Sequence, residues 1–214
     1  EEFFLKSNIA YKVIGSYYFY NRKEIKDLIA YLRLIMNNDD EISLRRVINV
    51  PKRGIGESSI RKLEEKSREE SITLFNALNS DKELEFKNLM LRITKESENL
   101  SLTELIDYIL NETGLKEELE NDKNLDSEIR LENLMEFKSI TASFEERTGT
   151  VNLNDFLEEI SLISDMSQYK DTENEITLMT IHSAKGLEFD VIFIVGMEEG
   201  LFPHSNSLFN KETI

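Results

Sequence analysis

The chain begins and ends with short apolar runs that predict β-strands. The segment "IAYKVIG" at residues 9–15 is rich in β-branched residues and ends at a glycine. Near the other end, "ITLMTI" (176–181) and "VIFIVG" (191–196) are runs of the same kind. The second is continuously apolar, which is typical of a strand buried on both faces of a parallel sheet. We interpret the aromatics of "SYYFYNR" (16–22) as core residues of a strand rather than as platforms that stack on bases.

Between these ends the apolar positions follow the period of an α-helix. A helix within residues 21–40 would bury one stripe, formed by Ile25, Leu28, Ile29, Leu32 and Met36. From residue 43 to residue 164 the pattern predicts only helices, several of which open on Ser, Thr or Asn as N-caps. Examples are residues 57–66, 71–79, 82–98, 101–111, 128–143 and 152–164.

Strands at both ends of a helical middle predict one interrupted domain. The fold class expected is an α/β, RecA-like partial domain with a parallel sheet, interrupted by a large all-α insertion. The expected boundaries are 1–42 and 171–214 for the two parts of the α/β domain and 43–170 for the insertion. The alternative, an α/β domain followed by an unrelated helical domain, does not explain why strands return.

Composition narrows the classes of function. The 214 residues contain no cysteine, which excludes disulfides, thiolate metal sites and thiol catalysis and fits a reducing cytoplasm. Two histidines without clustered ligands predict no metal site. The net charge of −16 argues against coating of nucleic acid by bulk electrostatics. Residues 1–60 nevertheless carry 10 basic and 8 acidic side chains, so a polyanion would approach this part of the chain.

Both histidines lie on loops that follow the predicted C-terminal strands. In "HSAKGLEF" (182–189), Ser183 and Gly186 allow a tight turn and Lys185 offers a cation. His182 adds a donor, and Glu188 adds a carboxylate that accepts hydroxyl hydrogen bonds. The second loop carries His204 and Ser205, either of which can donate to a phosphate. The alternative is that both histidines only bond backbone carbonyls of their loops.

The segment "VPKRGIGESSIRKL" (50–63) predicts a helix-hairpin-helix-like element. Gly54 and Gly56 permit unusual backbone angles, and a helix opens at Ser58 or the following serine. The backbone N–H groups of such a turn form an anion site, to which Lys52 and Arg53 add positive charge. The alternative is a plain interhelical turn, and we interpret "NETGLKEE" (111–118), which has one glycine and acidic neighbours, as such a turn.

Three segments together resemble one protein family. "LMTIHSAKGLEFDVIFIVGMEEGLFPHSNSL" resembles motif V and its downstream segment in the PcrA/UvrD/Rep group of superfamily 1 DNA helicases. "IAYKVIGSYYFYNRKEIKDLIAYLRLI" and "INVPKRGIGESSI" resemble the same group in the same order. The likeness covers roughly residues 1–66 and 174–209, whereas the middle matches by helical character alone. It implies part of the second motor domain (2A) and its helical insertion (2B) of a 3′-to-5′ ATP-dependent helicase.

The resemblance also implies roles for individual residues. Glu188, with Gly186 beside it, would contact the ribose of ATP, which the complete helicase binds with Mg2+. The single-strand contacts implied are His182, His204, Thr180, Ser183, Lys185, Ser205 and Arg22, with Ser183 and Lys185 in the loop that couples the nucleotide to the strand. The duplex contacts implied are Lys52, Arg53, Gly54, Ile55, Gly56 and Ser58.

The sequence lacks the phosphate-binding motif G-x-x-x-x-G-K-[ST] and an Asp-Glu pair that follows a strand and could hold magnesium. The arginine-bearing motif VI implied by the resemblance is also missing. We therefore expect a helicase fragment that does not hydrolyse ATP by itself. The resemblance implies single-stranded and duplex DNA and the first motor domain as partners, with repair or transcription proteins beside them. It implies DNA repair and replication in a bacterial cytoplasm, with no membrane. The alternative is an acidic adaptor that binds proteins, favoured if the amides of the Gly-Ile-Gly turn are buried or already bonded.

Overall fold

The computed structural model describes residues 9, 11–14, 16–122, 124–166, 175–179, 181–184 and 186–197. The chain divides into two compact units, Glu1–Leu178 and Met179–Ile214. No helix in these ranges is both long enough and apolar enough to cross a membrane.

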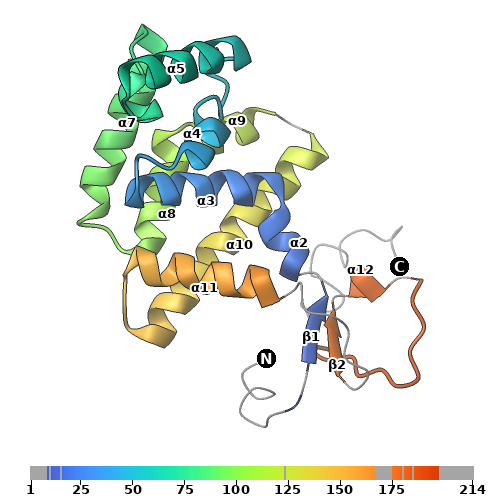
Figure 1. Ribbon diagram of the computed structural model, residues 1–214. Coiled ribbons are helices and arrows are strands. Elements are labelled where there is room, and N and C mark those ends of the chain that lie inside the picture. The colour runs from blue at the N-terminus through green and yellow to red at the C-terminus, as the bar shows by residue number, and fades with distance from the viewer. Residues whose placement is uncertain are drawn as a thin grey trace. The chain divides into compact units, whose positions relative to one another are not determined.

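The first unit is a bundle of helices that surrounds α3 (Figure 1). Its elements in chain order are β1 (Tyr11–Ile14), α2 (Ser16–Asn21), α3 (Lys23–Met36), α4 (Glu41–Val47), α5 (Glu57–Glu70), α6 (Leu74–Ala77), α7 (Asp81–Ser97), α8 (Leu102–Glu112), α9 (Leu115–Asn121), α10 (Leu125–Thr148) and α11 (Leu153–Met166). Helix α3 packs against α2, α4, α7, α10 and α11. The helical middle expected from the sequence is therefore confirmed.

The apolar stripe of α3 forms the centre of the core. Ile25, Leu28 and Leu32 are fully buried, because residues spaced by three and four lie on one face of a helix. Met36 differs from the prediction: its side chain is 48% exposed, since it lies in the last turn of α3 where the neighbouring helices no longer cover it.

Side chains cap several helix starts, as the sequence indicates. Ser80 and Ser101 each form a capping box with a glutamate three residues later, so α7 and α8 begin within one residue of the predicted starts.

Residues 71–79 differ from the prediction. Ser71 has a positive φ of 53° and ends α5, and only the short helix α6 follows, capped by Thr73. Because Ser71 is the left-handed C-cap of α5, it belongs to the end of that helix and the boundary moves.

The aromatic segment 16–22 is helical, so the prediction of a strand there is wrong. Helix α2 contacts α3, and Phe19 is 7% exposed in the core. The N–H of Arg22 donates to the carbonyl of Phe19 and closes a turn between the two helices. The interpretation of the aromatics as core residues is confirmed for Phe19, the ring whose burial decides the question.

Segments from both ends of the chain share a small sheet. Strand β1 pairs with β2 (Ile176–Met179) in a two-stranded sheet, and the parallel sheet of a RecA-like domain is not confirmed in the described residues. The buried strand expected at 191–196 is not confirmed, since Val191, Phe193 and Val195 are 71%, 87% and 86% exposed and no strand is assigned to them.

The second unit contains α12 (Ile181–Ala184) and the segment that follows it. The N–H of Leu187 donates to the carbonyl of Ala184 and closes a turn, in which Gly186 has a φ of +83°. Residues 187–197 lie exposed beyond this turn.

The guanidinium of Arg53 holds several helices of the first unit together. It donates to the carbonyls of Val47 and Ile48, at the end of α4, and of Thr113, at the end of α8. It also donates to the carbonyl of Pro51 and lies 5.3 Å from the ring centroid of Phe86 in α7. A cation is favourable at a helix C-terminus, where unbonded carbonyls carry partial negative charge, and this one serves two such ends.

The hydroxyl of Tyr31 extends this network into α3. It accepts a hydrogen bond of 3.0 Å from Arg53 and donates to the carbonyl of Val50. Burial raises the pKa of Tyr31 to about 12, although the charge of Arg53 opposes the increase. The phenol is therefore neutral over the whole physiological range and remains a donor.

We expect Arg53→Ala to lower the free energy of unfolding by about 2–4 kcal/mol, because buried carbonyls lose their donor and two helix ends lose their cation. Arg53→Lys should lie in between, since an ammonium cannot reproduce the planar set of donors. Urea unfolding followed by circular dichroism measures both. Arg68→Ala, at a side chain 76% exposed, is the control and should change stability by no more than about 0.5 kcal/mol. A loss in Arg53→Ala no larger than in this control would contradict the role of the guanidinium.

Glu83 fastens the start of α7. Its carboxylate accepts hydrogen bonds from the N–H groups of Asn79 (3.1 Å) and Ser80 (2.9 Å). Burial by itself would raise the pKa of Glu83, but these bonds and the Ser80 hydroxyl outweigh it and lower the pKa below 4.5. The folded state thus favours the ionised form, so its contribution is complete above about pH 4.5 and is lost as the pH falls through the lower, folded-state pKa.

Glu83→Gln should accordingly be less sensitive to acid than the wild type. Between about pH 6 and about pH 3.5 we expect the wild type to lose more stability than the variant, because only the wild type must protonate a bonded carboxylate. Thermal unfolding at a series of pH values measures this difference. The control is Glu85→Gln, an exposed neighbour on the same helix, which should follow the wild type. Parallel curves for Glu83→Gln and the wild type would show that the cap does not carry the acid sensitivity.

Candidate nucleic-acid interface

The Gly-Ile-Gly turn joins α4 to α5. Asp40 caps α4 by accepting from the N–H of Ser43. The turn that follows contains Gly54 at a φ of +73°, a conformation that favours glycine, and Gly56 is the N-cap of α5 without a side-chain cap. Two helices joined by a glycine turn are the arrangement that the predicted helix-hairpin-helix-like element requires.

The side chain of Asn49 fixes the inner half of the turn. Its Oδ1 accepts from the N–H of Arg53 (2.7 Å) and from the N–H of Ile55 (3.2 Å). The side chain of Ile55 is 2% exposed, so it anchors the turn in the core. The turn is therefore held in one conformation before any ligand arrives.

The outer half of the turn leaves its amides available. Within the described ranges, no acceptor bonds the N–H groups of Gly54, Gly56, Glu57 or Ser58. All four residues are exposed. Free amides in the turn favour a phosphate site, whereas bonded amides favour an adaptor. The structure contains both kinds: two amides are bonded inward to Asn49, and four face solvent. A row of outward N–H groups before a helix is suited to an anion.

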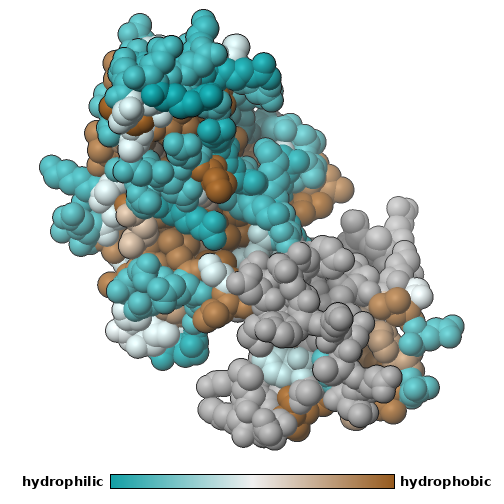
Figure 2. Space-filling view, in the orientation of Figure 1, coloured by the Kyte–Doolittle hydropathy of each residue, from teal (hydrophilic) through white to brown (hydrophobic). Residues whose placement is uncertain are grey.

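The basic residues around the turn differ from the expected set. Lys52 is exposed, as a phosphate contact requires. The guanidinium of Arg53, in contrast, is directed inward to carbonyls, so we expect it to position the turn rather than to contact DNA. Lys82 of α7 was missed by sequence reasoning: a Cβ at Gly54 would lie 2.6 Å from its Nζ. A lysine 28 positions along the chain gives no local signal of this approach. The visible face over α5 is predominantly hydrophilic (Figure 2).

The segment 111–118 is a turn between α8 and α9, as interpreted from the sequence. Gly114 has a φ of +80° and is the N-cap of α9. A Cβ at Gly114 would lie 4.0 Å from the ring of Pro51, and the carbonyl of Thr113 accepts from Arg53. This second turn therefore supports the first one from within the protein.

Arg22, a predicted single-strand contact, is engaged inside the first unit. It donates to the side chain of Asn133 in α10, which in turn donates to Glu24 at 2.6 Å. The guanidinium also lies 5.5 Å from the ring centroid of Phe19. These contacts fasten the start of α3 to α10, so we expect a positioning role for Arg22 rather than a contact with DNA.

Only part of the predicted nucleotide and single-strand site lies in the described residues. Glu188 is exposed and follows the turn at Gly186. His182 and Ser183 belong to α12, but nothing further is described for the side chain of either residue. Thr180, Lys185, His204 and Ser205 lie outside the described residues altogether. Their roles remain predictions.

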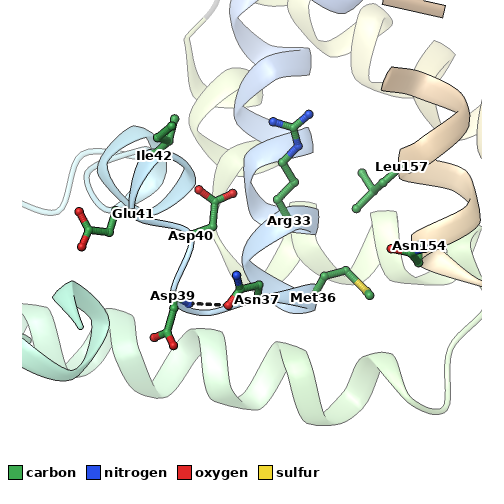
Figure 3. Close-up of a pocket in the computed structure, with 9 residues that line it drawn as sticks. All are labelled: Arg33, Met36, Asn37, Asp39, Asp40, Glu41, Ile42, Asn154 and Leu157. Atoms are coloured by element: carbon green, nitrogen blue, oxygen red, sulfur yellow. Dashed lines mark hydrogen bonds between the residues drawn. The ribbon is translucent and has the colours of Figure 1, made fainter. Parts of the chain in front are cut away.

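A cavity of about 600 Å3 opens between the end of α3, the start of α4 and α11 (Figure 3). Its lining consists of Arg33, Met36, Asn37, Asp39, Asp40, Glu41, Ile42, Asn154 and Leu157. The oxygens of Asp40 already accept from the N–H and the hydroxyl of Ser43. Asn37 likewise accepts from the N–H of Asp39. These polar groups stabilise the helix ends, and we assign the cavity no ligand.

Comparisons with known proteins show the family to which the chain belongs. The chain matches the model of the UvrD-like helicase C-terminal domain over residues 1–213. It is 44% identical to the ATP-dependent DNA helicase PcrA of Staphylococcus aureus strain Mu50, over 99% of this chain and 31% of the relative. It is also 44% identical to the protein of the same name in Staphylococcus epidermidis strain RP62A, over 99% of this chain and 31% of the relative.

The chain thus spans about a third of the length of the curated relatives that it matches, and the match extends through the helical middle, where the sequence offered no motif. A family model that covers residues 1–213 leaves almost no residue outside it. This chain belongs to the UvrD-like helicase C-terminal domain family.

Proposed function

We propose that this chain is part of an ATP-dependent 3′-to-5′ DNA helicase and that its helical body binds duplex DNA. The relatives that support this proposal are named ATP-dependent DNA helicase PcrA and match nearly the whole chain. In this proposal residues 1–42 and 171–214 belong to the second motor domain and residues 43–170 to its helical insertion.

The outward amides of the Gly-Ile-Gly turn carry the proposal. Phosphate oxygens of a duplex would accept from the N–H groups of Gly54, Gly56 and Ser58, beside the charge of Lys52. Ile55 and Arg53 contribute by holding the turn from the inside. Such contacts bind the DNA backbone without reading its sequence, as a helicase that acts on any duplex requires.

The second part of the proposal concerns the nucleotide and the single strand. Glu188, after the turn at Gly186, would accept hydroxyl hydrogen bonds from the ribose of ATP. The strand contacts proposed are His182, His204, Thr180, Ser183, Lys185 and Ser205. Phosphates and Mg2+ of the nucleotide would be held chiefly by the first motor domain. A loop that reaches both ligands would let closure on ATP shift the grip on the strand.

The exposed apolar run 191–195 is proposed to join a parallel sheet in the complete motor domain. Val191, Ile192, Phe193, Ile194 and Val195 expose between 58% and 87% of their side chains. Continuous β-branched and aromatic runs of this kind are typical of strands covered on both faces. Pairing of this run in the complete motor domain would explain why so apolar a segment lies uncovered in this structure.

The competing function is an acidic adaptor that binds proteins. The two inward-bonded amides of the turn are compatible with it. The match of nearly the whole chain to proteins named DNA helicases argues against the adaptor, because an adaptor would not need both the loop at 182–189 and the Gly-Ile-Gly turn.

Gly56→Ala tests the turn as a duplex grip without disturbing its fold. Gly56 has a φ of −90°, which alanine adopts, and nothing lies within 4 Å of the added Cβ. If a phosphate lies against the turn, the methyl group should displace it and weaken binding about five- to tenfold, or about 1–1.4 kcal/mol. Fluorescence anisotropy with a labelled duplex bearing a 3′ single-stranded tail, at low and moderate salt, measures this effect.

The control is Asn99→Ala, an exposed position beyond the far end of α7. It should bind as the wild type does. Circular dichroism should show that both variants remain folded. Equal affinity of Gly56→Ala and the wild type would refute the turn as the contact, and absence of any wild-type binding at low salt would refute the duplex-binding proposal for this chain.

A further inference from the structure

We propose that Lys82, at the start of α7, is a further contact for the phosphodiester backbone of duplex DNA at the Gly-Ile-Gly turn. This inference rests on the proposed function of the turn and extends its site to a residue on a different helix. The groups that would surround the phosphate are then the ammonium groups of Lys52 and Lys82 and the outward N–H groups of Gly54, Gly56, Glu57 and Ser58.

The geometry of Gly54 carries the inference. A Cβ there would lie 2.6 Å from Nζ, 3.7 Å from Cε and 3.8 Å from Cδ of Lys82. The end of the lysine side chain therefore crosses directly over the turn, in space that any other residue would fill. Glycine at position 54 serves two purposes, because it permits the φ of +73° and leaves room for the ammonium.

The ammonium of Lys82 has no carboxylate partner in the described part of the chain. Its side chain is exposed and forms no ion pair there, although Asp81 and Glu85 are close in sequence. Some cations of the helical body do pair: Arg45 lies 2.5 Å from Glu64, and Lys138 lies 2.6 Å from Asp107. In a chain with a net charge of −16, an unpaired ammonium on a turn with free amides is available to an anion.

The position of Lys82 within α7 does not serve the helix. It is the second residue of α7, where the partial positive charge of the helix end disfavours a cation. The capping box of Ser80 and Glu83 fixes this first turn, so the lysine projects from a rigid base. A phosphate on the turn would offset the repulsion, because it would be attracted to the ammonium and to the helix end together.

The chemistry of lysine suits a backbone contact. An ammonium is a compact charge on a flexible chain, and it binds phosphate without the fixed geometry that reads a base. Two lysines from separate segments, Lys52 and Lys82, flank one glycine turn. The ligand class inferred is therefore a phosphodiester of DNA rather than a carboxylate or a metal ion.

The test is the salt dependence of duplex binding by this chain. Each phosphate that a cation neutralises adds about 0.9 to the slope of log Kobs against log salt, so Lys82→Gln should lower the slope by about this amount. If the variant and the wild type bind equally at 1 M salt, a slope lower by about 0.9 makes the variant bind about eightfold more weakly than the wild type at 0.1 M salt. Lys82→Arg keeps the charge and should restore most of the slope. Anisotropy titrations with a blunt duplex and with a single strand of the same sequence should place the effect on the duplex.

The matched control is Lys95→Gln. Lys95 is exposed in the last turn of the same helix, about 20 Å from Lys82 by the rise of an α-helix, and should keep the wild-type slope. A wild-type slope in Lys82→Gln would overturn the inference while the turn itself survives. An equal fall in Lys95→Gln would also overturn it, since any lysine would then serve. An effect confined to the single strand would assign Lys82 to the other ligand and contradict the duplex contact.

Discussion

A single guanidinium at the ends of two helices determines how the turn region is built. Arg53 donates to carbonyls at the ends of α4 and α8, to the carbonyl of Pro51 and to the hydroxyl of Tyr31. The carbonyl of Val47 also accepts from the N–H of Val50, whereas the partly buried carbonyls of Pro51 and Thr113 have Arg53 as their donor. Arg53 therefore stabilises the packing of the helices around the Gly-Ile-Gly turn, and contact with a ligand is left to the exposed residues beside it.

This arrangement divides the turn into two faces with separate tasks. Asn49 and the side chain of Ile55 satisfy the inner face, and the amides from Gly56 onward are left to the outer face. A flexible loop would lose entropy when it bound an anion, whereas this loop is already ordered. The rigidity that stabilises the fold thus also prepares the surface on which the proposed duplex contact depends.

Local patterns in the sequence predicted the local structure well. The stripe of α3, the caps at Ser80 and Ser101, and the turn at Gly54 all follow from short-range spacing, and the structure contains them. The strand expected at 16–22 failed because packing of Phe19 against α3 outweighed β-propensity. The direction of Arg53 and the approach of Lys82 to Gly54 could not be predicted, because they depend on residues from α7 and α8 that only the tertiary fold brings near.

The hydrogen bond from Arg53 to the carbonyl of Thr113 affects how a force applied at the turn is distributed in the protein. Through it, the Gly-Ile-Gly turn is fastened to the end of α8 as well as to α4. A load applied at the turn would be shared among several packed helices instead of stretching one loop. The turn would then be rigid relative to the helical body, so that a force on a bound ligand would displace the helical body as a whole.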